Sequence, residues 1–454
     1  MNKNEIPSTL EPEMDNYQKQ LVDSCFEEGQ YIAGIKALEQ LRSPNHRPAG
    51  YHIRQLLYIA LHPAKKSPAI QVPGSPSKLE KRRLRTLMSI SLEASLAAQR
   101  TLFAFAQTNS LEAIFNALPS LSRTEDATGS IEDSPLAIEA LCISRCKSCW
   151  NLLSPGLIQP TAEQFHVKRY PSSDSEEDDL EPVVADHAWP VLKWLIFLFE
   201  HDEARMERKG LPRHSPCLLE QIPAPKGERN LRWEVEAPLD IVFSCLKAPE
   251  SHQLLGARLF MLIINLSSTT FFDFHAFVIG VYKRVTAQSD ILDDFLTLLS
   301  RLSCTLAVLR FKVTFLQKCL APTAISSRTS RPKPQARAPA KQKRYEEPPS
   351  TNRGASVPSQ RITSKPVLPS FADISKALGN PPPKTVRSMN NTVSFELLAS
   401  YGTLQSQIAV PERDSEWMEL ESDDRWEALL DTVFKDRDNA DSYRSILTTL
   451  RTTW

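Results

Sequence analysis

Glycine is scarce in this chain, with 13 among 454 residues, which is under half of the average usage of about 7%. Folds that bring the backbone close to a phosphate group, such as Rossmann and P-loop folds, depend on clustered glycine. Residues 29–36 have two glycines at P-loop spacing but lack a lysine directly after the second glycine and a Ser or Thr after that. The sequence therefore predicts no nucleotide-binding loop.

The chain also lacks net charge, because 54 basic residues balance 54 acidic ones. No field of the whole protein would steer it to nucleic acid or to an anionic membrane. The first 18 residues hold no apolar core with a cleavage site, so they do not resemble a signal peptide. Eight cysteines without such a signal are typical of reduced thiols. We expect a nuclear or cytoplasmic protein without disulfides.

Alternating strand patterns are missing, and the apolar spacing is helical instead. One stripe predicts a helix and consists of Ile53, Leu56, Leu57, Ala60 and Leu61. Ser134 with Pro135 predicts a second helix start. Ser77 with Glu80 forms a capping-box pair that predicts a helix carrying Leu84, Leu87, Met88 and Leu92. These patterns predict an all-α fold, an irregular helical array.

Residues 25–41 contain a local motif, in which Gly29 and Tyr31 form a Gly-x-Tyr turn followed by Gly34, Leu38 and Leu41. This motif resembles half of a tetratricopeptide repeat, with Gly34 at the usual alanine position. The resemblance covers about one repeat and implies two antiparallel helices and a solenoid-like array.

Two segments are apolar on all sides. Residues 186–200 predict a helix in the centre of a core. Residues 258–282 are long enough to span a membrane as a helix. Asp273 and His275 would make such a helix costly. We therefore expect two buried helices joined by a turn, with the membrane span as the alternative.

The composition changes after residue 320. Residues 328–387 contain 13 basic and 3 acidic side chains, with proline and serine throughout, which is typical of a disordered linker. Helical spacing then returns, and residues 412–441 contain 12 acids and 4 bases. We predict a disordered N-terminus (1–13), a helical array (14–320) with an acidic loop near 171–183, a basic linker (321–393) and an acidic amphipathic helical tail (394–454).

The cysteines at positions 142, 146 and 149 have the spacing of the iron–sulfur ligands in radical-SAM enzymes. Their flanks are helical, and on a helix three such positions share one face, as small core thiols would. No partner at zinc spacing and no catalytic motif accompany them. We therefore expect no cofactor, no metal and no enzymatic activity, although residues far apart in sequence could still assemble an active site.

Three groups are candidate functional residues. The first is an aromatic-rich stripe that could dock into a partner's groove, formed by Trp426, Leu429, Leu430, Val433 and Phe434. The second is a basic patch of Arg331, Lys333, Arg337, Lys341, Lys343 and Arg344, joined by Lys81, Arg82 and Arg83. The third is a pair of candidate phosphorylation sites, Ser173 and Ser175, each with an acid three residues on.

Together these features predict a non-enzymatic adaptor or scaffold, a complex subunit that binds other proteins through the helical array and through the tethered tail. A flexible tether raises the effective concentration of its second contact to the order of millimolar. The alternative is a nuclear regulatory protein that holds nucleic acid through the basic linker. Salt dependence separates the two, because phosphate contacts weaken steeply with salt.

Overall fold

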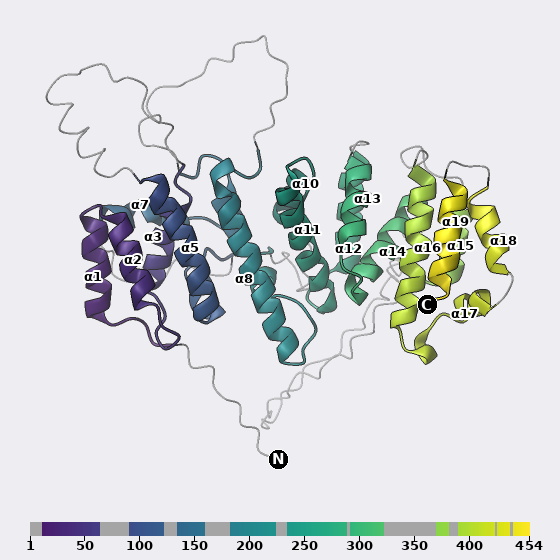
Figure 1. Cartoon of the computed structure of the whole chain (residues 1–454), viewed down its shortest axis with the longest axis horizontal. Helices are drawn as coiled ribbons and strands as arrows, with labels where there is room; N and C mark the ends of the chain where they lie inside the picture. Colours follow the sequence, from purple (N-terminus) through teal and green to yellow (C-terminus); the bar gives the residue numbers. More distant parts are fainter. Residues whose placement is uncertain are drawn as a thin grey trace, which may run out of the picture. The chain divides into compact units, whose positions relative to one another are not determined.

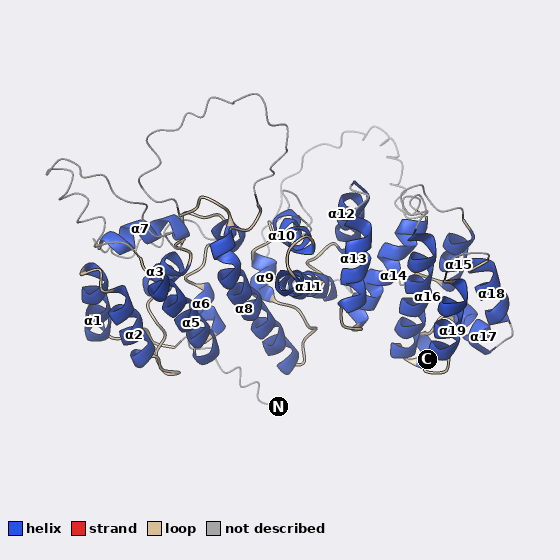
Figure 2. Ribbon diagram, turned by 45° about the horizontal axis from the view of Figure 1, so that its top comes forward, coloured by secondary structure: helices blue, strands red, loops and turns tan. Residues whose placement is uncertain are grey.

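The computed structural model describes residues 11–63, 90–121, 134–158, 182–223, 234–287, 291–321, 369–380, 389–422, 425–435 and 439–454. Within these ranges the chain is helical throughout and has no β-strand, which confirms the all-α prediction (Figure 2). None of the helices in these ranges is long and apolar enough to cross a membrane.

The chain forms two compact units, residues 1–303 and 304–454. The helices of the first unit are α1 (Asn16–Glu27), α2 (Tyr31–Leu41), α3 (Gly50–Ala60), α5 (Leu92–Thr108), α6 (Leu111–Phe115), α7 (Pro135–Ser144), η1 (Cys149–Leu153), η2 (Asp186–Ala188), α8 (Trp189–Arg208), α9 (Pro216–Glu220), α10 (Glu236–Leu246), α11 (Glu250–Asn265), η3 (Leu266–Ser268), α12 (Phe274–Ala287) and α13 (Ile291–Arg301). Figure 1 shows them in chain order from purple to green.

The predicted repeat-like motif forms the antiparallel hairpin α1–α2. Gly29 makes the turn with a φ of 72°, a conformation that glycine adopts without strain. A Cβ at Gly34 would lie 2.5 Å from the Cε1 of Phe26. Phe26 therefore takes the space that the alanine of a tetratricopeptide repeat would use, which explains the glycine at this position.

Several predicted helices are present. The Ile53 stripe lies on α3, which is buried on nearly all sides because it packs against both α5 and α7. The Ser134 hydroxyl caps α7 by accepting from the Ala137 amide at 3.1 Å. Residues 258–282 form parts of α11 and α12 with a turn between them, as expected. Of the helix predicted from Ser77, only the end is described, and there α5 begins at Leu92 with its own cap, Ser91.

Two pairs of neighbouring helices in the first unit, α2 with α5 and α8 with α11, run in the same direction. Arg42 near the end of α2 donates to Ala104 and Thr108 near the end of α5. Helices α8 and α11 meet at three successive levels, first through Trp189 and His252, then through Glu200 and Arg258, then through Glu203 and Asn265. Parallel neighbours of this kind are typical of stacked helical repeats.

The second unit joins helices that lie far apart in sequence. It contains α14 (Leu306–Leu320), α15 (Phe371–Gly379), α16 (Asn390–Gln407), η6 (Val410–Glu412), α17 (Ser415–Ser422), α18 (Arg425–Val433) and α19 (Ala440–Arg451). Helix α14 packs along α16 and also contacts α15.

The division at residue 304 differs from the predicted boundary at 320, because α14 is apolar on nearly all sides and α16 covers part of it. Much of the predicted linker lies outside the described residues. Helix α14 before residues 322–368 and helix α15 after them both belong to the second unit.

Candidate interaction surfaces

The surface of the first unit carries a row of apolar side chains across three helices. On α5, Leu96 is exposed and Phe103, seven residues on, is half-buried. The Phe103 ring lies 5.7 Å from the ring of Phe197 on α8. On α11, Arg258 binds Glu200 of α8, and the exposed Leu254 lies one turn before Arg258. We call these residues the α5–α8–α11 face.

Two buried carboxylates near the end of α8 bind groups on neighbouring segments. Asp202 and Glu203 are almost fully buried. Asp202 accepts from Arg205 at 2.9 Å, from the Ser215 hydroxyl at 2.8 Å and from the Cys217 amide at 2.9 Å. The network therefore fixes the segment before α9 against α8, since a buried carboxylate needs several donors.

Glu203 extends this network to α11. Its two oxygens accept from Arg213 at 2.9 Å and from Asn265 at 2.7 Å. Burial raises the pKa of Glu203 above its usual 4.5, against the opposing effect of Arg213, and the hydrogen bond to Glu203 in turn raises the pKa of Arg213. The described contacts of this cluster are structural, because every oxygen of both carboxylates already accepts from a protein donor.

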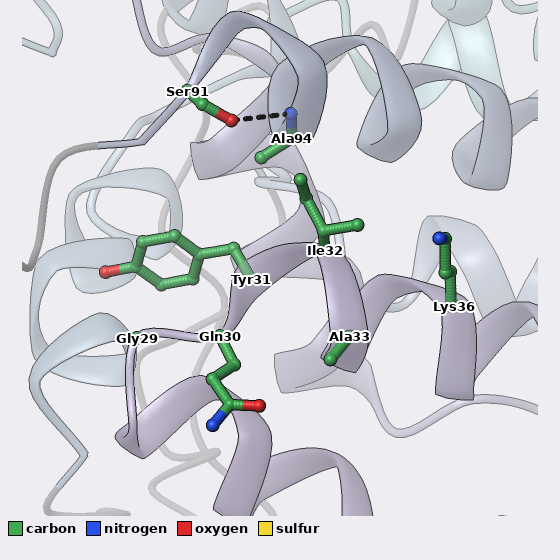
Figure 3. A pocket seen from close by; sticks show the side chains of 8 residues that line it. All are labelled: Gly29, Gln30, Tyr31, Ile32, Ala33, Lys36, Ser91 and Ala94. Atoms are coloured by element: carbon green, nitrogen blue, oxygen red, sulfur yellow. Dashed lines mark hydrogen bonds between the residues drawn. The ribbon is translucent and has the colours of Figure 1, made fainter.

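A shallow hollow of about 430 Å³ opens between the first turns of α2 and α5 (Figure 3). It is lined by Gly29, Gln30, Tyr31, Ile32, Ala33, Lys36, Ser91 and Ala94. The Ser91 hydroxyl is engaged in capping α5, where it accepts from the Ala94 amide at 3.1 Å. Lys36 is the one formally charged side chain in this lining, so the hollow offers a contact surface and no pair of groups for acid–base chemistry.

The predicted docking stripe of α18 points into the second unit. Trp426, Leu430 and Phe434 are buried, Val433 is nearly so, and Leu429 is half-buried. The ring of Trp426 lies 5.7 Å from that of Trp417 and 5.9 Å from that of Trp454. Four of the five side chains therefore belong to the core of this unit, where Trp417 of α17, Tyr443 of α19 and Trp454 cover the apolar face of α18.

The aromatic cluster is fixed by a single carboxylate. Asp414 accepts from the Phe371 amide at 2.8 Å, from the Tyr401 hydroxyl at 3.1 Å and from the Trp417 amide at 3.2 Å. The rings of Phe371 and Tyr401 pack on Trp417 at 5.5 and 5.2 Å. Asp414 is not among the predicted site residues; its local signal is that of an N-cap, because it directly precedes α17 and accepts from the amide three residues on.

The cysteine prediction is correct in part. Burial raises the pKa values of Cys142 and Cys146, the latter to about 11, and Cys149 is fully buried. Contrary to the prediction, the three cysteines do not share one helix. Helix α7 ends at Ser144, and Ser148 is the N-cap, with a capping box, of the separate 3-10 helix η1. Among the described residues no group of three His, Cys, Asp or Glu side chains could hold a metal ion.

The other predicted site residues lie outside the described part of the chain. They are Arg331, Lys333, Arg337, Lys341, Lys343 and Arg344 of the basic patch, its helical part Lys81, Arg82 and Arg83, and the phosphorylation candidates Ser173 and Ser175. Their roles stay predictions.

Comparison with known proteins gave no match to any family model, any curated protein or any solved structure.

Proposed function

We propose that this protein is a non-enzymatic adaptor or scaffold, a subunit that binds other proteins through its helical array. The observation that supports this most is the α5–α8–α11 face, where exposed Leu96 and Leu254 flank the half-buried rings of Phe103 and Phe197. Stacked helices commonly use such extended surfaces for binding, and apolar side chains that lie side by side on a surface are typical of protein contacts.

The proposed second binding element is the whole second unit. Docking by the α18 stripe alone would require Trp426 to leave the aromatic cluster, which would cost its buried contacts. The exposed side chains of the same region remain accessible, among them Val410, Met418 and Ile446. A partner that contacts both units gains from their covalent connection, since the second contact becomes intramolecular.

Affinity capture of the tagged full-length chain, read by mass spectrometry, tests this function. The substitutions Leu96→Glu and Leu254→Glu place charge on the α5–α8–α11 face at exposed positions, so the fold should persist. The matched control is Tyr17→Glu, which changes an exposed aromatic residue on α1. We expect the double variant to lose specific partners that the control keeps.

Nuclease treatment separates the adaptor from a nucleic-acid-binding protein. Recovery of the same proteins after nuclease would support direct protein contacts. Recovery that collapses with nuclease, and falls steeply as salt rises, would contradict the adaptor proposal and favour phosphate binding by the basic linker.

A further inference from the structure

The α5–α8–α11 face repeats one pattern of side chains on two of its helices. In each, a cation has an apolar side chain one helical turn before it and another one turn after it, because positions three or four residues apart share one side of a helix. The two sets are Leu96, Arg100 and Phe103 on α5, and Trp189, Lys193 and Phe197 on α8. Both cations are exposed, whereas the three aromatic side chains are half-buried. We call Arg100 and Lys193 the α5–α8 cations.

The two sets lie side by side in the array. The Phe103 ring lies 5.7 Å from the Phe197 ring. The indole nitrogen of Trp194, which follows Lys193, donates to the carbonyl of Leu102 at 2.9 Å. Both contacts lie about one helical turn or less from a cation, so a ligand that lies across α5 and α8 would meet both cations together.

The positive charge of the α5–α8 cations is not neutralised within the described part of the chain, where neither forms an ion pair or a hydrogen bond. Glu200, the acid in the middle of this face, already accepts from Arg258 of α11 through both oxygens, at 2.7 and 2.6 Å. The other exposed acids of the three helices lie in a first or last turn and are Glu93, Glu207 and Glu250. The middle of the face is therefore apolar and positively charged.

We propose that this part of the face binds an amphipathic helix of a partner protein that carries carboxylates beside its apolar residues. A partner helix that lies along α5 has the same rise of about 1.5 Å per residue. Apolar, acidic and apolar residues at i, i+4 and i+7 of that helix would therefore lie opposite Leu96, Arg100 and Phe103. The apolar residues would act as anchors on the phenylalanine rings, and the acids would pair with the α5–α8 cations. This inference rests on the proposed adaptor role and deepens it, because it names one class of partner.

The sequence favours a partner protein over a segment of this chain as the source of the helix. Outside the described ranges, the stretches rich in acids are residues 122–133 and 171–181. Ile131 is the one large apolar residue of the first stretch and Leu180 of the second, so neither supplies two apolar anchors two turns apart. The two longest segments outside the described ranges have net positive charge and are residues 64–89 and 322–368.

Fluorescence anisotropy with the full-length protein tests this assignment. The probe is a labelled peptide of about 18 residues, long enough to form a helix, with leucines three or four residues apart and glutamates beside them. In the control peptide lysine replaces every glutamate, which keeps the apolar side and reverses the charge. We expect the acidic peptide to bind about tenfold more tightly than the basic one, with an affinity that falls as salt rises.

The variant Arg100→Gln with Lys193→Gln removes both charges at exposed positions, so the fold should persist. We expect it to bind the acidic peptide about threefold to tenfold more weakly, the effect of losing two exposed ion pairs. The control variant, Lys147→Gln with Lys376→Gln, removes two exposed cations elsewhere and should bind like the parent. Leu96→Ser removes an apolar anchor and should also weaken binding about threefold to tenfold.

Four results would overturn the proposal: no binding of the acidic peptide, equal binding of the acidic and basic peptides, equal loss in the Arg100 and control variants, or undiminished binding by Leu96→Ser. Two further results would show that the partner assignment is wrong. If amides in place of the acids of residues 171–181 raise the affinity for the acidic peptide strongly, the chain's own segment covers the face. If the parent self-associates and Arg100→Gln with Lys193→Gln does not, a second copy covers it.

The capture experiment does not depend on the charge of the peptide. A failure of the acidic peptide to bind leaves the loss of captured partners in the Leu96→Glu and Leu254→Glu variant unaffected, so the two proposals fail separately.

Discussion

The two units are stabilised in different ways. In the first, polar links recur along the array, from Arg42 between α2 and α5 to Glu203 between α8 and α11. In the second, the contacts converge on one aromatic cluster, where Trp417, Trp426 and Trp454 pack mutually within 6 Å. The first arrangement shares stability among neighbouring helices, whereas the second makes it depend on a few large side chains.

This difference teaches where binding surfaces can lie. An array of stacked helices can leave one side of a helix uncovered, as on α5 and α8, because each helix packs mainly on its neighbours. A unit built around a cluster turns its large aromatic residues inward, and its exposed apolar side chains, Val410, Met418 and Ile446, lie on separate short elements. Substitutions in each unit can test the contrast.

The largest effect is expected for Trp426→Ala. Removing a fully buried ring should lower the free energy of unfolding of the second unit by about 3 to 5 kcal/mol. Leu429→Ala, on the same helix at a half-buried position, is the control and should cost much less. Amide hydrogen exchange resolved by segment measures both, and we expect α16 to α19 to lose protection while α1 to α8 keep theirs. Loss of protection in both units would contradict independent stabilisation.

The second prediction concerns the polar links of the array. Glu203→Ala leaves the buried Asn265 amide without its acceptor and Arg213 without its partner. We expect a loss of roughly 3 kcal/mol, toward the upper end of the cost of an unpaired buried polar group. Exchange protection should fall in α8 and α11, with α17 to α19 unchanged. Protection that falls equally along the whole first unit would show that its stability is not shared locally.

A glycine pair sharpens the comparison further. A Cβ at Gly402 would lie 2.4 Å from the Trp454 ring, whereas a Cβ at Gly280 on α12 meets nothing within 4 Å. Gly402→Ala should therefore destabilise the second unit by about 1 to 2 kcal/mol. Gly280→Ala should stabilise the first unit by about 0.5 to 1 kcal/mol through helix propensity. Urea titration followed by tryptophan fluorescence measures the first, and circular dichroism the second. Equal signs for the two would refute the packing argument.

The smallest effect is a pH dependence. Burial raises the pKa of Glu203 above 4.5 in the folded state. Between the pKa of the unfolded state, near 4.5, and the higher pKa of the folded state, the folded protein keeps a proton on Glu203 that the unfolded protein has lost. The free energy of unfolding therefore falls as pH rises through this window. In Glu203→Gln this contribution should vanish. The measurement is the unfolding midpoint of the wild-type protein and of Glu203→Gln at a series of pH values from 4.5 upward. A wild-type protein that gains stability relative to the variant as pH rises would contradict the prediction.

Local sequence signals predicted the fold class and several helices correctly. Ser134 caps α7 and Gly29 turns the first hairpin, because capping and turn chemistry act within a few residues. Site predictions were less successful. The amphipathic pattern around Trp426 indicated an apolar face without specifying what covers it, and that cover includes Trp454, 28 residues further along the chain.

The sequence by itself determined that this protein is all-α, where many of its helices lie and that residues 258–282 form two helices with a turn between them. Only the tertiary structure decided that α14 joins α16 rather than the array, that Glu203 binds Asn265, and that Phe103 and Phe197 form one surface. The physical reason is that helix formation depends on neighbours three and four residues apart, whereas each of these contacts joins residues more than 60 positions apart, and apolar spacing carries no information about which partner is chosen.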